Sequence, residues 1–426
     1  MIDSNILKKA DPITRRRMVE LMAAGCLSLT YSSSAWAAGS KSQTGGGKAK
    51  SLITIYAAGG MSHVDSFDIK EANKDANKNS EPIKTSANGI RVGKYFKNMA
   101  KHMDSFALVN SMQHSLGVHL FASYMTKTAY EKSSTIVHPE LGGWISKHKK
   151  SRSGDIPPFV KIGGGTLGNG FFPGQYGALP IGNPSAGVDN VTLPDGISKK
   201  LFEERLDLTN AMNREFEKTL NNTMTKDYHT AYEHAVQLMK SKDLEVFDLS
   251  KESAKTKELY GKNEFGTSCL LARRLVEKGV NSVSLSLGSW DDHAGIYEYY
   301  GERSAKLDQG VAALIGDLKS RGLLDSTIVA IMTEFGRDAK ISSQGGRGHN
   351  PRGYTQLLAG GGIKGGQQYG STDKMGQTAV DKIVSPGDFH ATIGYALGID
   401  TNMIEMSSTG RPFTLGNKGK PITALF

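Results

Sequence analysis

The sequence predicts an α/β fold, with a doubly wound, mostly parallel sheet, helices on both faces and a helical insertion. Short apolar runs typical of buried strands recur along the chain, at residues 52–57, 106–110, 159–162, 281–287 and 326–332. Amphipathic stretches typical of helices precede the last two runs, at residues 266–277 and 307–318. Strands and helices that alternate on this spacing favour a largely parallel sheet with helices on both faces.

The N-terminal segment has the features of an export signal. Three consecutive arginines, residues 15–17, precede a weakly apolar run at 21–29, and the Ala-Trp-Ala at 35–37 is a small-x-small cleavage pattern. Paired arginines with modest hydrophobicity are typical of a twin-arginine signal, and an ordinary secretory signal is the alternative. We therefore expect residues 1–37 to be a signal peptide and the twin-arginine export machinery to be a partner.

The two cysteines bear on the destination of the protein. Cys26 lies within the signal, so cleavage after Ala37 leaves Cys269 as the one thiol and excludes an internal disulfide. We expect a periplasmic or secreted protein. The alternative is a lipid anchor through Cys26, because residues 23–26 resemble a lipoprotein box. No later segment has the roughly 18 apolar residues that a membrane span needs, so we expect no transmembrane segment in the mature protein.

The formal net charge of +10 is unevenly distributed. Half of it lies in residues 1–50, which hold 8 Lys/Arg and 3 Asp/Glu. The rest of the chain has only a modest basic excess and no basic stripe interleaved with aromatic residues. This distribution argues against nucleic acid as a partner.

The composition also divides the chain. Residues 38–50 are rich in Gly, Ser and Lys and predict a flexible linker. We expect residues 51–426 to form one domain, because large α/β sheets often use this length as a single unit. Apolar residues at three- and four-residue steps from 199 to about 265 predict a helical insertion within it.

Polar side chains follow the apolar run at 281–287. Asp291 and His293 are two residues apart, so in an extended chain both side chains point to the same side. A carboxylate and an imidazole so placed form half of a site for a divalent cation. The alternative is a capping aspartate beside a surface histidine.

Glu334 closes the run at 326–332, and Gly336 lets the backbone turn after it. Arg337 then supplies a planar guanidinium, which suits phosphate or sulfate esters. We therefore predict catalytic roles for Glu334 and Arg337, with Arg337 also binding an anion. The alternative for Glu334 is an ion pair with a nearby arginine.

A glycine-rich loop at residues 345–352 contains His349 and two further candidates for anion binding, Arg347 and Arg352. The carboxyl ends of neighbouring parallel strands meet at one edge of a sheet, so we expect groups from separate loops to converge there. Of the eleven histidines, five fall in loops at predicted strand ends: His63, His114, His119, His293 and His349.

Several short motifs occur together in this chain. They include Gly59-Gly-Met-Ser-His-Val-Asp65, Ser268-Cys-Leu-Leu-Ala-Arg-Arg-Leu275, Trp290-Asp-Asp-His293, Glu334-Phe-Gly-Arg337, Gly345-Gly-Arg-Gly-His349 and Tyr369-Gly-Ser-Thr-Asp373. In this order they resemble the exported bacterial proteins called domain of unknown function 1501, over about residues 51–400. That family is similar to the sulfatase and alkaline-phosphatase superfamily. The resemblance implies a doubly wound sheet with a metal site at the strand ends.

Carried over by position, the resemblance implies two sites for divalent metal ions, for which Zn²⁺, Mn²⁺ and Ca²⁺ are candidates. Asp291, His293 and His349 would form the first site. Glu334 and a residue that follows the first strand would form the second.

The chain departs from the superfamily at the second site. The superfamily usually has an aspartate directly after strand one, whereas Ser62 stands near that place here, so His63 or Asp65 would substitute as ligand. The superfamily commonly has Asp followed by His or Asn where this chain has Glu334-Phe335, which removes one ligand.

The nucleophile is the largest departure. The stretch at 117–127 corresponds to the one that carries it, but contains no Cys and no Ser or Thr at the aligned position. A metal-activated water would then attack directly, with His119 as base or ligand. Alternatively, the fold has lost hydrolysis and kept binding.

Two functions are therefore compatible with the sequence. The first is an exported, metal-dependent hydrolase of phosphate or sulfate esters, whose substrate is an anionic ester or a glycan, for example on a surface polysaccharide. The alternative is a non-catalytic exported protein that binds a glycan or a partner during envelope assembly.

Overall fold

The computed structural model describes residues 47–163, 168–189, 191–193, 195–220 and 223–426. The expected signal peptide, Cys26 and the linker up to residue 46 lie outside the described residues. Ala49 was assigned to the flexible linker, but it is buried and its N–H donates to the carbonyl of Ala396 at 3.1 Å. The packed chain therefore already includes the last residues of the predicted linker.

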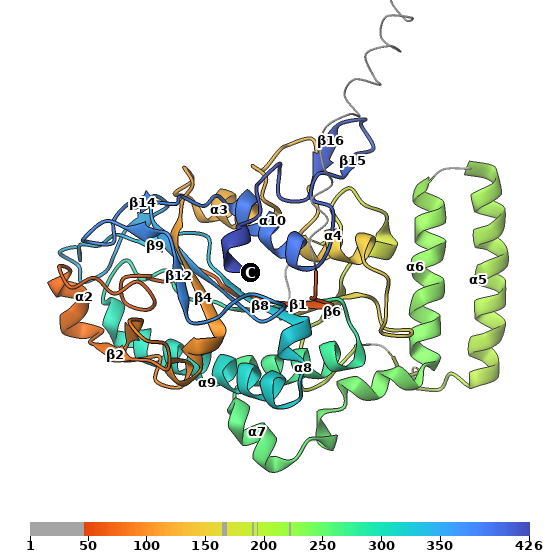
Figure 1. Ribbon diagram of the computed structural model, residues 1–426. Coiled ribbons are helices and arrows are strands. Elements are labelled where there is room, and N and C mark those ends of the chain that lie inside the picture. Colours follow the sequence, from red (N-terminus) through yellow and green to blue (C-terminus); the bar gives the residue numbers. More distant parts are fainter. Residues whose placement is uncertain (1–46, 164–167, 190, 194, 221–222) are drawn as a thin grey trace, which may run out of the picture. The chain divides into compact units, whose positions relative to one another are not determined.

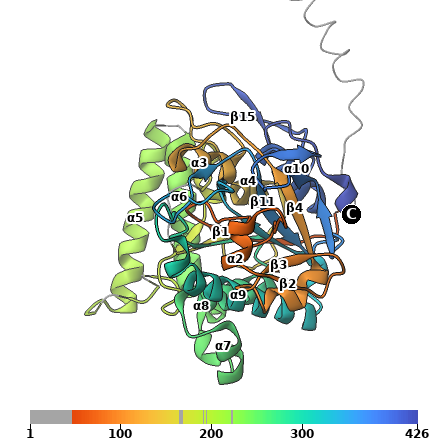
Figure 2. The same cartoon turned by 90° about the vertical axis from the view of Figure 1, so that its left-hand side faces the viewer.

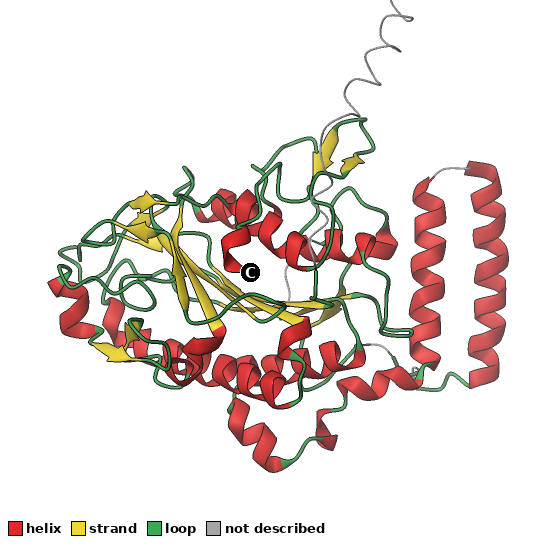
Figure 3. Cartoon of the chain, in the orientation of Figure 1, coloured by secondary structure: helices red, strands yellow, loops and turns green. Residues whose placement is uncertain are grey.

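An eight-stranded sheet forms the centre of the described chain, and helices cover both of its faces (Figures 1 and 3). The strand order is β12 (Gln367–Tyr369), β4 (Phe106–Met112), β11 (Tyr354–Ala359), β8 (Thr327–Met332), β1 (Ser51–Ala57), β7 (Ser282–Leu287), β5 (Phe159–Ile162) and β6 (Leu179–Ile181). Strand β11 is antiparallel to both of its neighbours, and the other neighbouring pairs are parallel. The predicted class, a doubly wound and mostly parallel α/β sheet, is confirmed.

The helices surround this sheet in two groups. Their bounds are α2 (Lys74–Asn79), α3 (His119–Thr128), α4 (Leu141–His148), α5 (Lys199–Leu220), α6 (Thr223–Lys240), α7 (Ala254–Tyr260), α8 (Glu264–Lys278), α9 (Ile296–Ser320) and α10 (Pro386–Ala396). Helices α8 and α9 lie on one face, and α3, α4 and α10 lie on the other (Figure 1).

All five strands expected from the sequence are present, with ends within two residues of the prediction. The helix expected at 307–318 is much longer and begins at Ile296. Its first turns are mostly polar and bury only single positions such as Ile296 and Tyr300, so they lack the apolar periodicity that marks the second half.

Strand β1 separates two hydrophobic cores. Ile53, Ile55 and Ala57 belong to one core, whereas Leu52 and Tyr56 belong to the other. This division follows from the period of two in a strand, which sends successive side chains to opposite faces. Both faces of β1 are therefore packed, as is usual for a parallel sheet.

Helices α5 and α6 lie side by side within the region where we expected the insertion (Figure 2). Helix α6 contacts the 3₁₀ helices η3 (Gly174–Tyr176) and η4 (Lys242–Phe247). In the described part of the chain, no helix is both long and apolar enough to cross a membrane.

We predict that Ile55→Ala lowers the free energy of unfolding by about 3 kcal/mol, because it removes a fully buried side chain from the central strand. The matched control is Leu208→Ala in α5, where the side chain is 63% exposed and the cost should stay below about 0.5 kcal/mol. Urea titration of both variants measures the difference, and equal costs would contradict this account of the core.

Candidate metal centre

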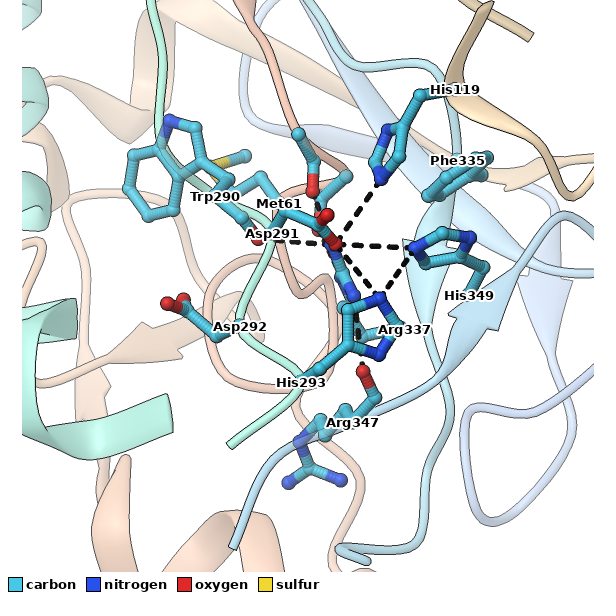
Figure 4. Close-up of polar contacts among 12 residues, drawn as sticks. Met61, His119, Trp290, Asp291, Asp292, His293, Phe335, Arg337, Arg347 and His349 are labelled. Atoms are coloured by element: carbon cyan, nitrogen blue, oxygen red, sulfur yellow. Dashed lines mark hydrogen bonds and ion pairs between the residues drawn. The ribbon is translucent and has the colours of Figure 1, made fainter. Parts of the chain in front are cut away.

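Loops from separate parts of the sequence meet at the carboxyl edge of the sheet (Figure 4). His119 is the first residue of α3, Asp291 and His293 follow β7, and Glu334 follows β8. A short antiparallel ladder, β9 (Gly336–Arg337) with β10 (His349–Asn350), places His349 opposite Arg337. The convergence expected from the strand ends is therefore present for these groups.

Asp291 forms a cluster with Arg337 and three histidines, His119, His293 and His349, and its Oδ1 atom lies at the centre of this cluster. Nη2 of Arg337 is 2.5 Å from it, and Nε2 of His293 is 3.0 Å from it. The Nε2 atoms of His119 and His349 are each 3.1 Å from it. Burial alone would raise the pKa of Asp291, but the bonds from Arg337 and His349 outweigh it and hold this pKa well below its ordinary value. The carboxyl group is therefore ionised.

The hydrogen bonds made by the Nδ1 atoms of His119 and His349 fix the tautomer of each ring. Nδ1 of His119 lies 2.7 Å from Oε1 of Glu334, and Nδ1 of His349 lies 2.7 Å from the carbonyl oxygen of Gly117. Both oxygens can only accept, so Nδ1 carries the proton in each ring. In a neutral ring Nε2 is then an acceptor, yet both Nε2 atoms face Oδ1 of Asp291, which is also an acceptor. A cation, either protons or a metal ion, is needed to hold these atoms together.

Glu334 lies behind His119 and is almost fully buried. Besides His119, it accepts hydrogen bonds from the Tyr56 hydroxyl and the Gly59 N–H, both at 2.8 Å. Burial raises its pKa, but the hydrogen bonds, from His119 foremost, outweigh burial and lower it. The bond to Glu334 in turn raises the pKa of His119.

This arrangement corrects the predicted ligand role of Glu334. Both of its carboxylate oxygens are engaged by protein donors, and it contacts the cluster through His119. Glu334 is therefore a positioning residue in this structure. The alternative of an ion pair with an arginine is not found among its contacts in the described chain.

His63 and Asp65 do not approach the cluster, which corrects their prediction as metal ligands. Asp65 is fully buried and binds Arg347, Tyr297 and Ser62 through its two oxygens. His63 is buried too, and its Nε2 lies 2.6 Å from the carbonyl oxygen of Gly376. Burial lowers the pKa of His63, which favours its neutral form.

Arg337 does not have the predicted catalytic and anion-binding geometry. Its side chain is fully buried, and its N–H groups donate to four backbone carbonyls as well as to Asp291. The carbonyls belong to Gly59, Gly60, Trp290 and Arg347. Residues 59 and 60 have φ values of +113° and +74°, which only glycine adopts readily. The guanidinium thus holds the loops after β1 and β7 in place.

The other two arginines differ from each other. Arg347 is fully buried, and its donors bind Asp65, Tyr297 and the carbonyls of Asp338 and Ala339, so it is not placed to bind an external anion. Arg352 is exposed and remains a candidate for that role.

Two residues around the centre were not predicted from the sequence, and a third, His114, was given no role. The hydroxyl of Tyr56 binds Glu334, and the carbonyl of Gly117 binds His349. His114 accepts from the Leu116 N–H through Nδ1, so its Nε2–H donates to the Glu334 carbonyl at 2.6 Å. The signal for Tyr56 was its place near the end of a central strand, whereas a backbone carbonyl leaves no signal in a sequence.

The contacts of Asp291 and the three imidazoles include no hydroxyl or thiol group within the described ranges.

Comparison with known proteins gives a family and a set of similar structures. The sequence model of the family described as "Protein of unknown function (DUF1501)" matches residues 49–426. No curated protein sequence matches the chain. Similar solved structures include Ps i-CgsB in complex with k-i-k-neocarrahexaose, at 12% identity and a TM-score of 0.40 over 87% of this chain and 75% of that one.

Two further structures show a similar degree of likeness. The lipoteichoic acid synthase LtaP from Listeria monocytogenes has 10% identity and a TM-score of 0.41, over 84% of this chain and 74% of that one. A protein in the alkaline phosphatase superfamily from Vibrio parahaemolyticus has 11% identity and a TM-score of 0.39, over 89% and 71%. These values are too low to transfer the role of any residue.

The contacts of Arg337 give a prediction about stability. Arg337→Met should lower the free energy of unfolding by about 3–5 kcal/mol, because it leaves a group of inward-facing carbonyls and Asp291 without their donor. The matched control is the exposed Arg352→Met, with a change within about 0.5 kcal/mol. Chemical denaturation measures both. An unchanged stability in Arg337→Met would restore the anion-binding interpretation.

Proposed function

The chain belongs to the DUF1501 family, and we propose that it is an exported, metal-dependent hydrolase of phosphate or sulfate esters. The observation that carries the proposal is the arrangement of acceptor atoms around Oδ1 of Asp291. His119, Asp291 and His349 each offer one ligand atom, and these atoms all lie within 4.8 Å of one another. His293 lies beside them, with its Nε2 2.9 Å from that of His349.

Protons alone are a poor source of the positive charge that this cluster needs. The rings of His119 and His349 have centroids 4.4 Å apart. Two imidazolium charges at about 4 Å repel by about 4 kcal/mol at an effective dielectric of roughly 20. Arg337 adds a further positive charge at the same carboxylate. One divalent ion would replace the protons and remove the repulsion between the rings.

The surroundings of the rings also fit a metal site. Histidines that bind a metal usually donate their other N–H to a carboxylate or a backbone carbonyl, which orients the ring. Glu334 and the carbonyl of Gly117 provide these acceptors for His119 and His349. The imidazole-rich donor set favours Zn²⁺ over Mn²⁺, and Ca²⁺ least, because calcium prefers oxygen ligands.

The residues of the chain have separate roles in the proposed reaction. His119, His349 and Asp291 would hold the ion. His293 would act as a further ligand or would carry a proton. A divalent ion held by these residues would supply Lewis-acid chemistry, which can polarise an ester oxygen and lower the pKa of a water. The side chains of Asp291 and His293 are 44% and 53% exposed, so a large substrate can reach them. Anionic esters, including those on glycans, fit a site of this charge.

Export is proposed from the N-terminal segment alone. The arginines at 15–17 and the cleavage pattern at 35–37 favour the twin-arginine route and a periplasmic or secreted protein, with a lipid anchor through Cys26 as the alternative. Mass spectrometry of the mature N-terminus distinguishes the two. A chain that begins after Ala37 supports release, and a lipidated Cys26 supports the anchor.

A non-catalytic binding protein is the second candidate. It is favoured by the lack of a hydroxyl or thiol in the contacts of the described cluster. On this account the centre holds a glycan or an envelope partner through a metal ion and releases no product.

We predict that the purified protein contains about one divalent ion per chain and that Asp291→Ala and His349→Ala lose it. The matched control is His234→Ala, which removes an exposed histidine on α6 and should keep the ion. Elemental analysis by mass spectrometry measures the content. A protein without bound metal, or one whose metal survives both substitutions at the centre, would exclude this metal site.

The reaction class is tested on the metal-loaded protein with phosphate monoesters, phosphodiesters and sulfate esters. We expect hydrolysis of one class, lost in Asp291→Ala and retained in His234→Ala. Bound metal without turnover of any class would favour the binding protein instead.

We also predict that Glu334→Gln weakens metal binding about 10–100-fold, because glutamine cannot hold the Nδ1–H of His119 as a carboxylate does. Tyr56→Phe removes a single hydrogen bond to Glu334 and should weaken it less. Titration with Zn²⁺ against a competing chelator measures both dissociation constants. An unchanged constant in Glu334→Gln would mean that His119 is not a ligand.

A further inference from the structure

A cavity of about 210 Å³ lies between the sheet and the helices α3 and α4, beside the metal centre. Thr54 and Tyr56 of β1 and Ser284 and Ser286 of β7 form its floor. Lys127 of α3 is among the residues on the opposite side. The cavity is accessible, because Ser286 is exposed.

The polar floor is unusual for its position. Strands of a parallel sheet are commonly apolar on both faces. In β7 the serines 282, 284 and 286 alternate with Val283, Leu285 and Leu287, so one face of a strand in the middle of the sheet carries hydroxyl groups. With Thr54 on the neighbouring strand, these hydroxyls offer a group of donors to whatever occupies the cavity.

Lys127 has no ion-pair partner among the described residues. Its Nζ lies 4.4 Å above the centre of the Tyr56 ring, and it makes no hydrogen bond or ion pair within the described ranges. The second lysine of the cavity, Lys161, donates to Glu140 at 2.8 Å. The charges of Lys161 and Glu140 balance each other, so the positive charge of Lys127 is left over. Burial lowers the pKa of Lys127, which shows that the ammonium is poorly solvated.

We propose that this cavity binds one compact oxyanion group, a sulfate or a phosphate, through Lys127 and the hydroxyls of Ser284 and Ser286. The ammonium supplies the opposite charge and the hydroxyls supply further donors to the anion oxygens. The group is either a second ester on the substrate of the proposed centre or a free inorganic anion. The first source rests on the proposed function, whereas the binding itself does not.

Tyr56 connects the cavity with the centre. Its ring forms part of the cavity wall, and its hydroxyl donates to Oε2 of Glu334. A substrate with two anionic groups could therefore place one at the metal and the other beside Lys127. This would select substrates that carry more than one ester.

Calorimetric titration with sodium sulfate and sodium phosphate tests the proposal, on the protein as purified and again after treatment with a chelator. We expect saturable binding that persists without metal and weakens at least tenfold in Lys127→Met, in line with the loss of a charged hydrogen bond. The control is Lys132→Met, which removes an exposed lysine four residues after the end of α3 and should change nothing.

A second variant guards against misfolding. Ser286→Ala removes one donor at an exposed strand position and should weaken binding a few-fold, while the melting temperature stays unchanged. Titration with a sugar monosulfate identifies the source. Tighter binding of the sugar ester than of inorganic sulfate assigns the group to a substrate, and the reverse assigns it to a free anion.

The proposal is overturned if no saturable binding occurs, if binding disappears with the metal, or if Lys127→Met binds as tightly as Lys132→Met. A protein that binds sulfate after chelation but hydrolyses nothing would retain this subsite and lose the proposed hydrolase.

Discussion

The buried guanidinium of Arg337 is the constraint on which the geometry of the centre depends. It donates to carbonyls in the loop after β1 and the loop after β7, and to the carbonyl of Arg347. These loops are far apart in the sequence. A planar group with five donors can satisfy several inward-facing carbonyls at once, which an ammonium cannot. Asp291 is therefore held where the imidazoles meet.

A second constraint fixes the direction of the imidazoles. Glu334 and the carbonyl of Gly117 each take the Nδ1 proton of a ring and leave Nε2 facing Asp291. Hydrogen bonds to Glu334, from His119 foremost and then from the Tyr56 hydroxyl and the Gly59 N–H, lower its pKa despite its burial and keep it ionised. Buried polar groups destabilise a fold unless they are hydrogen-bonded. This set of buried hydrogen bonds therefore indicates a functional role for the imidazoles that it orients. These hydrogen bonds orient the Nε2 atoms of His119 and His349 towards Oδ1 of Asp291, so three acceptors face one point, which is what binding a cation requires.

Much of the fold could be predicted because its signals are local. The period of two in β1 and the apolar runs of β7 and β8 are visible in the sequence, and the rule that parallel strands end at one edge brings the loops of Asp291 and Glu334 to that edge. His349 is placed there by the short antiparallel ladder of β9 and β10. The roles of Arg337, Arg347 and Asp65 could not be predicted in this way. Many of their partners are backbone carbonyls, and others are side chains from distant parts of the sequence, such as Asp65 and Arg347, which are 282 positions apart; neither kind of contact leaves a local pattern. A motif shows which side chains gather, but burial and hydrogen bonding decide which of them remain free to act.

The same limit explains why the cavity was not anticipated. The serine alternation of β7 is visible in the sequence, but it resembles the solvent face of an edge strand unless β7 is known to lie between β1 and β5. Once that order is known, the hydroxyls must face something polar. Lys127 supplies it from α3, and Tyr56 lies between Lys127 and Glu334, at 4.4 Å from one and 2.8 Å from the other. Positive and negative groups then alternate from Lys127 through Glu334 and His119 to Asp291. Tyr56 thus connects the cavity, on one face of the sheet, with the metal centre at the carboxyl edge of the sheet.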